Sequence, residues 1–322
     1  MRFSISMRAL SLGMLLFLVG SWGCAARSGQ QGTFRTNEYR KMMERQKQKA
    51  VMAAEEEAAK KGPELTAEGY EALGDSHLRQ GNMDMAFVQY DRALRMDPKQ
   101  GRVHYKMGRL FLEKGMAEEA RKEFQDVLKA DPNNAPAYEG MGRAYFSMGD
   151  LSESERNFHE AVRLGPGLWQ AHNFLGIIYD RRKKFEVAVD QYKEAISLKP
   201  DVSSLFNNLG ISLFLKGDYE EAVRAFEEAS RLENSNRKVH NNLALALCKL
   251  GRYKEALGAF KEGGDEASAY YNLGCVYIME GKYREAIEAF EKAIKVKPGV
   301  YVSAQENLKR ARAAMNIKPE KN

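Results

Sequence analysis

The feature that most constrains this chain is a set of residue types that recurs every 34 residues from Ala67 almost to the C-terminus. When each window is numbered from 1, position 8 is glycine in six of the seven windows and alanine in the sixth window. Position 24 is aromatic in all seven windows: Tyr90, Phe124, Phe158, Tyr192, Phe226, Phe260 and Phe290. Because aromatic residues make up only 10% of the chain, these matches indicate one structural unit repeated seven times.

Each window predicts two helices joined by a tight turn. Small residues at positions 8 and 20 allow the two helices to approach closely, and the ring at position 24 fills the space between them and their neighbours. A glycine in left-handed conformation commonly ends a helix, and six windows place one at the middle turn. These glycines are Gly81, Gly115, Gly149, Gly217, Gly251 and Gly281. Proline at position 32 of most windows ends the second helix.

These residues and their spacing resemble the tetratricopeptide repeat family. The resemblance covers seven repeats, at residues 67–100, 101–134, 135–168, 169–202, 203–236, 237–266 and 267–300. Because one such unit cannot bury its apolar face alone, the repeats are expected to stack. The resemblance implies an all-α fold, a right-handed α-solenoid in which the first helix of each repeat lines a concave groove.

Two stretches depart from the repeat. The sixth repeat has only 30 residues, and its second helix is expected to stop about one turn early, at Gly263. Residues 301–315 predict a helix that caps the last repeat, followed by a tail at 316–322.

The N-terminus predicts a signal peptide at residues 1–23. Arg2 and Arg8 precede a 12-residue apolar run, which is too short to span a bilayer. The stretch ending at Cys24 resembles the signal of bacterial lipoproteins, which implies lipidation of that cysteine. Since Ala25 follows, the same resemblance implies an outer membrane lipoprotein facing the periplasm. The alternative is ordinary cleavage nearby and a soluble periplasmic protein.

Residues 24–66 predict a tether between this signal and the repeats. Residues 38–61 are rich in strong helix formers but have no continuous apolar stripe. A solvated, partly helical spacer and a partner-binding helix both fit this stretch.

Several function classes find no support in the sequence. Acidic and basic residues are mixed along nearly every segment despite the net charge of +6, which disfavours a nucleic acid partner. There is no phosphate-binding loop, zinc-protease motif, nucleophile elbow or CxxC pair. His104, His172 and His240 share position 4, where other repeats have aromatic rings, and are too far apart for one metal. We therefore expect no enzyme, cofactor, metal site or small-molecule substrate.

The resemblance implies that a protein or extended peptide binds in the groove, which positions 2, 5, 6, 9, 12 and 13 would line. Asparagines occupy positions 5 and 6 late in the array, namely Asn173, Asn207, Asn208, Asn241, Asn242 and Asn272. Side-chain amides both donate and accept, so they can pair with a peptide backbone. The alternative is that they bond between neighbouring repeats. Early groove positions are basic instead, with Arg102, Lys106, Arg109 and Arg143 available for acidic groups of a partner.

Two cysteines, Cys248 and Cys275, are predicted to face the groove on adjacent first helices. An exported chain meets an oxidising compartment, so they form a candidate disulfide. Two free thiols are the alternative, because a bridge needs Cα atoms within about 7 Å.

A lipoprotein signal followed by such repeats is similar to accessory proteins of bacterial pilus machines. The segment NNLALALCKLGRY, followed by NLGCVY, is similar to the end of type IV pilotins, and GDEASAYYNLG to Tad pilus accessory proteins. These likenesses imply a non-enzymatic scaffold that assists assembly of a pilus or secretin complex. The alternative is a general cell-envelope scaffold that recruits enzymes of wall or polysaccharide synthesis.

Overall fold

The computed structural model describes Met42, Met43, Arg45, Lys49 and residues 65–297 and 302–317. The predicted signal peptide with Cys24, most of the tether and most of the tail lie outside these residues. The described residues from 65 onward form fifteen helices and no strand, which confirms the all-α class. The helices are α3 (Ala67–Arg79), α4 (Met83–Met96), α5 (Gly101–Glu113), α6 (Ala117–Ala130), α7 (Ala135–Met148), α8 (Leu151–Leu164), α9 (Trp169–Arg181), α10 (Phe185–Leu198), α11 (Ser203–Lys216), α12 (Tyr219–Leu232), α13 (Arg237–Lys249), α14 (Tyr253–Glu262), α15 (Glu266–Met279), α16 (Tyr283–Val296) and α17 (Val302–Ile317). None of the described helices is long and apolar enough to cross a membrane.

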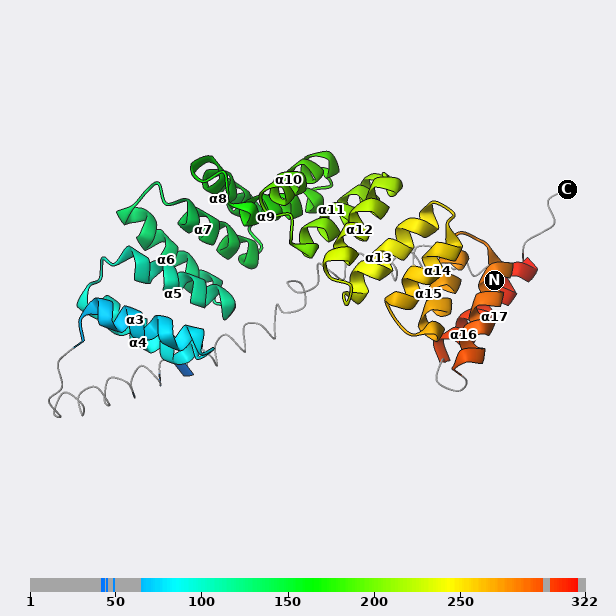
Figure 1. Ribbon diagram of the computed structural model, residues 1–322, viewed down its shortest axis with the longest axis horizontal. Coiled ribbons are helices and arrows are strands. Elements are labelled where there is room, and N and C mark those ends of the chain that lie inside the picture. Colours follow the sequence, from blue (N-terminus) through cyan, green and yellow to red (C-terminus); the bar gives the residue numbers. More distant parts are fainter. Residues whose placement is uncertain (1–41, 44, 46–48, 50–64, 298–301, 318–322) are drawn as a thin grey trace, which may run out of the picture. The chain divides into compact units, whose positions relative to one another are not determined.

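Helices α3 to α16 follow one another as pairs joined by short turns (Figure 1). All six glycines predicted at the middle turns have positive φ, as in Gly149 at 84°. The fourth repeat has no glycine there, and Lys183 adopts φ of 59° instead. The glycine pattern therefore predicted the turns correctly, and the fourth repeat makes the same turn with a lysine.

The pairing of position 8 with position 24 sets how closely the two helices of a repeat approach. A Cβ atom on Gly210 would lie 2.6 Å from Phe226 Cε1, and one on Gly74 would lie 2.4 Å from Tyr90 Cε1. Tyr90 and Phe226 are fully buried. In these two repeats a glycine leaves the space that the ring occupies next to the facing helix, as the sequence predicted.

The chain forms two compact units, which divide within α9. The described residues of the N-terminal unit end at Ile178, and those of the C-terminal unit begin at Tyr179. The core of the N-terminal unit is centred on Tyr90 and Phe124 and includes Met43. In the C-terminal unit α17 lies beside α16 (Figure 1) and buries three apolar residues against it: Ala304, Leu308 and Ala311. Their spacing of four and three residues gives α17 one apolar face for capping.

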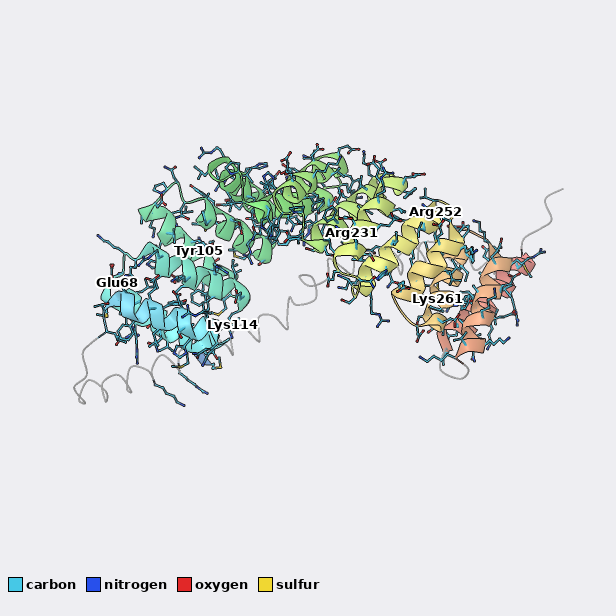
Figure 2. All side chains as sticks on the ribbon, viewed as in Figure 1. Glu68, Tyr105, Lys114, Arg231, Arg252 and Lys261 are labelled. Carbon is cyan, nitrogen blue, oxygen red and sulfur yellow. The ribbon has the colours of Figure 1, made fainter. Side chains whose placement is uncertain are left out.

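The sixth repeat is shortened in its second helix. Helix α14 has 10 residues, whereas α12 and α16 have 14 each. It ends at Glu262, and the carbonyl of the following Gly263 accepts a hydrogen bond of 2.7 Å from Arg237 Nε. Lys261, labelled in Figure 2, donates to Glu266 at 2.7 Å, and its Nζ lies 5.4 Å from the centre of the Tyr270 ring. The structure thus confirms that the second helix of the sixth repeat ends early. Hydrogen bonds from Arg237 of α13 and to Glu266 of α15 stabilise this end.

Candidate partner-binding surfaces

The first helices of the C-terminal unit bring two of the predicted partner-binding asparagines together. Asn242 Nδ2 on α13 donates to Asn207 Oδ1 on α11 at 3.0 Å. Asn242 is only 3% exposed, whereas Asn207 is half-buried. This bond joins neighbouring repeats, which is the structural role that the sequence left open for these residues.

The remaining asparagines lie in different surroundings. Asn208 and Asn272 are half-buried on α11 and α15, and the Asn272 amide makes no hydrogen bond to another described residue. Asn241 faces the end of α14, since a Cβ on Gly263 would lie 2.8 Å from its Oδ1. Asn173 lies on α9 in the N-terminal unit. We call the half-buried Asn207, Asn208 and Asn272 of the C-terminal unit the asparagine face.

The predicted basic cluster of the N-terminal unit is already paired with acidic residues of the first repeat. Arg102 donates to Glu71 at 2.9 Å, and Lys106 donates to both Glu71 and Asp75 at 2.7 Å. Burial disfavours the Asp75 carboxylate, but hydrogen bonds from Lys106 and the Tyr90 hydroxyl outweigh it and lower the pKa of Asp75. Two of the four predicted cations therefore join repeats one and two.

Arg109 and Arg143 are the other two of the four predicted cations. Arg109 is exposed on α5, and Arg143 Nη1 on α7 lies 4.0 Å from Glu139 Oε1. Burial raises the pKa of the Glu139 carboxyl against the opposing effect of both arginines. Acidic groups of a partner would meet these two arginines beside a partly buried carboxyl group.

Two of the three position 4 histidines link their repeat to the turn that precedes it. His104 Nε2 donates to the Pro98 carbonyl at 2.9 Å, and His240 Nε2 donates to the Asn234 carbonyl at 2.7 Å. His104 Nδ1 also lies 2.7 Å from Glu123 Oε2, and that hydrogen bond raises the pKa of His104. At position 4, His104 and His240 therefore make hydrogen bonds to the backbone, in addition to any packing of the ring. No group of three metal-ligating side chains occurs within the described ranges.

The two cysteines of the candidate disulfide are free thiols. Cys248 is 2% exposed, and burial raises the pKa of its thiol to about 12. Cys275 Sγ instead accepts a hydrogen bond from Asn307 Nδ2 of α17 at 3.8 Å. Cys275 therefore faces the capping helix, a contact that the groove position did not predict.

A buried carboxylate that the sequence analysis missed lies at the start of the C-terminal unit. Asp180 is 5% exposed and accepts hydrogen bonds from the Ser212 hydroxyl at 2.7 Å and the Tyr192 hydroxyl at 2.8 Å. Burial raises its pKa to about 6, because neither hydroxyl neutralises the charge. Asp180 could have been found in the sequence, because it is the one charged residue at position 12 of the repeats. The other residues at this position are Leu78, Leu112, Phe146, Phe214, Cys248 and Ile278.

Family comparisons agree with the paired helices. Models described as tetratricopeptide repeat match residues 45–101, 77–144, 139–203, 201–263 and 267–299, which together exceed half of the chain. The chain belongs to the tetratricopeptide repeat family. The first match begins at residue 45, within the stretch that the sequence analysis assigned to the tether. Members of this family are typically non-enzymatic scaffolds, and the fold of this chain supports protein–protein interaction.

Two solved structures with TM-scores above 0.5 share this fold. A tetratricopeptide repeat protein from Parabacteroides merdae is 17% identical, with 76% of this chain and 98% of that chain covered and a TM-score of 0.52. The Cut9–Hcn1 complex of the APC/C is 22% identical over 75% of this chain, with a TM-score of 0.53. This chain spans 48% of the matched chain of that complex. The MamA protein is 25% identical, with 52% and 92% covered and a TM-score of 0.46. No curated protein matches the sequence.

Proposed function

We propose that this protein is an exported, lipid-anchored scaffold that holds an extended segment of a partner protein on its asparagine face. The main support is Asn272, which is half-buried on α15 and makes no hydrogen bond through its amide to another described residue. An amide group that is neither charged nor fully buried can donate to one peptide carbonyl and accept from one peptide N–H. Such a surface recognises backbone more than side chains.

The proposed partner segment is therefore extended and uncharged where it meets this face. Asn207 contributes its amide hydrogens, because only its oxygen is committed to Asn242. In the N-terminal unit, Arg109 and Arg143 would receive acidic side chains of the partner, since Arg102 and Lys106 are already bonded to Glu71. A partner with an acidic stretch and a separate uncharged stretch fits these two surfaces best.

The membrane anchor of this proposal rests on Cys24, which follows the predicted signal peptide. Mass spectrometry of the mature N-terminus tests it. We expect a lipid-modified cysteine in the native chain, and a Cys24→Ser variant that leaves the membrane fraction. An unmodified N-terminus elsewhere, with both chains in the same soluble fraction, would remove the anchor from the proposal.

The assembly that the scaffold assists is, in our proposal, a pilus or secretin complex of the outer membrane. Its support is the local sequence likeness around residues 241–253 and 264–277. A deletion strain should lose secretin multimers and surface pili, and the native gene should restore both. Multimers and pili at normal levels in the deletion strain would reject this assignment. The asparagine face would then serve another envelope assembly.

A further inference from the structure

One position of the second helices, position 22, is buried in the first repeat and exposed in the other six. Position 22 is exposed in repeats two to seven, where the residues are Lys122, Arg156, Asp190, Arg224, Gly258 and Glu288. In repeat one the same position is Val88, which is only 6% exposed. Because the repeat geometry leaves this position open six times, a group outside the repeats must cover Val88.

Met43 is the described residue that fits this role. It is 4% exposed and belongs to the same buried cluster as Phe87 and Val88 of α4, although it precedes the first repeat by more than twenty residues. Its neighbour Met42 is 37% exposed. Both methionines are in helical conformation, so adjacent side chains point in different directions, and only one enters the cluster.

We propose that the outer face of α4, centred on Val88, is a docking surface for the chain's own segment around Met43. The docked segment caps the array at its N-terminal end. Terminal repeats of a solenoid need a polar or covered outer face, and α17 supplies that cover at the other end. The family match that begins at residue 45 extends the repeat-like sequence into this segment. Met43 thus belongs to the buried core of the first repeats.

Docking also limits how far the array can move from the membrane, a consequence that rests on the proposed anchor at Cys24. If the chain were free up to residue 66, it would reach at most about 140 Å. With Met43 docked, only residues 25–42 remain, and the reach falls to about 60 Å. The first repeat would then stay close to the membrane surface.

Limited trypsin digestion of the purified full chain tests the docking, with cleavage after Arg45 and Lys49 followed by mass spectrometry. Val88→Asp introduces the residue type that repeat four carries at this position, Asp190, and adds no trypsin site. We expect V88D to accelerate these cleavages about tenfold or more, while cleavage within repeats four to seven stays unchanged. Met43→Asp should have the same effect, and Met42→Asp should change the rates by less than about twofold.

Two results would overturn the proposal. One is equal cleavage in V88D and the native chain, and the other is equal cleavage in M43D and M42D. Circular dichroism shows whether V88D keeps its helices; if it does not, Val88→Ala and Met43→Ala provide milder variants with the same expected direction. The double variant should be cleaved no faster than either single one, because both remove one contact. The same series in a Cys24→Ser chain separates this proposal from the anchor, since a missing lipid leaves these rates unchanged.

Discussion

Asn242 on α13 donates its side-chain amide to Asn207 on α11 across 3.0 Å, and this bond holds the first helices of repeats five and six together. Asn242 is almost fully buried, whereas Asn272, at the same position of repeat seven, is half-buried and has no such bond among the described residues. One residue type at one repeat position therefore has two roles. The two asparagines can be separated experimentally.

Replacing Asn242 with alanine should lower the free energy of unfolding by about 1–3 kcal/mol, because it removes a buried amide and leaves the Asn207 oxygen without its donor. Asn272→Ala should change it by less than about 0.5 kcal/mol. Urea denaturation of both variants measures the difference. Equal losses of stability would show that the Asn207–Asn242 bond contributes nothing particular to the fold.

The close approach of Gly210 to Phe226 predicts that an added methyl group is harmful there. Gly210→Ala should destabilise the chain by about 1–3 kcal/mol, because its Cβ would overlap a fully buried ring. Gly258 in α14 is the matched control, since a Cβ there meets no atom within 4 Å. Gly258→Ala should stabilise by about 0.5–1 kcal/mol through helix propensity. Thermal unfolding of the pair should move in opposite directions, and a shift in the same direction would refute the packing argument.

The pH dependence of stability should contain a component from Asp180. Its pKa is raised from 3.8 to about 6 in the folded chain, so the folded state binds the proton more tightly than the unfolded state. Stability from this group is therefore complete below about pH 4 and is lost as the pH rises through about 6, by roughly 3 kcal/mol in total.

Asp180→Asn removes the ionisable group while keeping an acceptor for one of the two hydroxyls. The variant should lack the decline between about pH 4 and pH 7 and be more stable than the native chain at neutral pH. Denaturation across this range measures both effects. Parallel pH profiles for the two chains would show that the carboxyl group is not held at a raised pKa.

Lys183 is in the left-handed region, with φ of 59°, where the equivalent turns have glycine. Lys183→Gly should raise the free energy of unfolding by about 1 kcal/mol, because it removes the steric cost of a Cβ atom in this conformation. Lys193→Gly, at an exposed position inside α10, should instead lower it by about 1 kcal/mol. If both substitutions destabilise equally, the turn at Lys183 stores no strain.

The fold was predictable because the decisive contacts recur locally. Position 8 and position 24 of one repeat lie 16 residues apart and meet within one helix pair, as Gly210 and Phe226 do, so one window of sequence contains both partners. The early end of α14 was also predictable, since a length difference can be counted directly.

The surface chemistry was less predictable because it depends on contacts between repeats. Whether Asn242 faces a partner or Asn207 depends on how two helices cross, which the repeat frame does not encode. In the sequence, Arg102 and Lys106 are candidates for binding acidic groups of a partner. In the structure both already donate hydrogen bonds to Glu71 of the preceding repeat. The burial of position 22 in the first repeat has a single sequence signal, the apolar Val88. That signal is visible only when the residues at position 22 of all seven repeats are compared.

Quantitative affinity capture from native envelopes tests whether the asparagine face holds the partner. The native chain is compared with an Asn208→Ala, Asn272→Ala variant and with an outer-face control, Arg224→Ala, Glu288→Ala. We expect recovery of a protein that the native chain and the control both retain to fall by about tenfold or more with the asparagine variant, because two amide contacts of about 1 kcal/mol each are lost. Equal recovery of every captured protein by all three chains would contradict it.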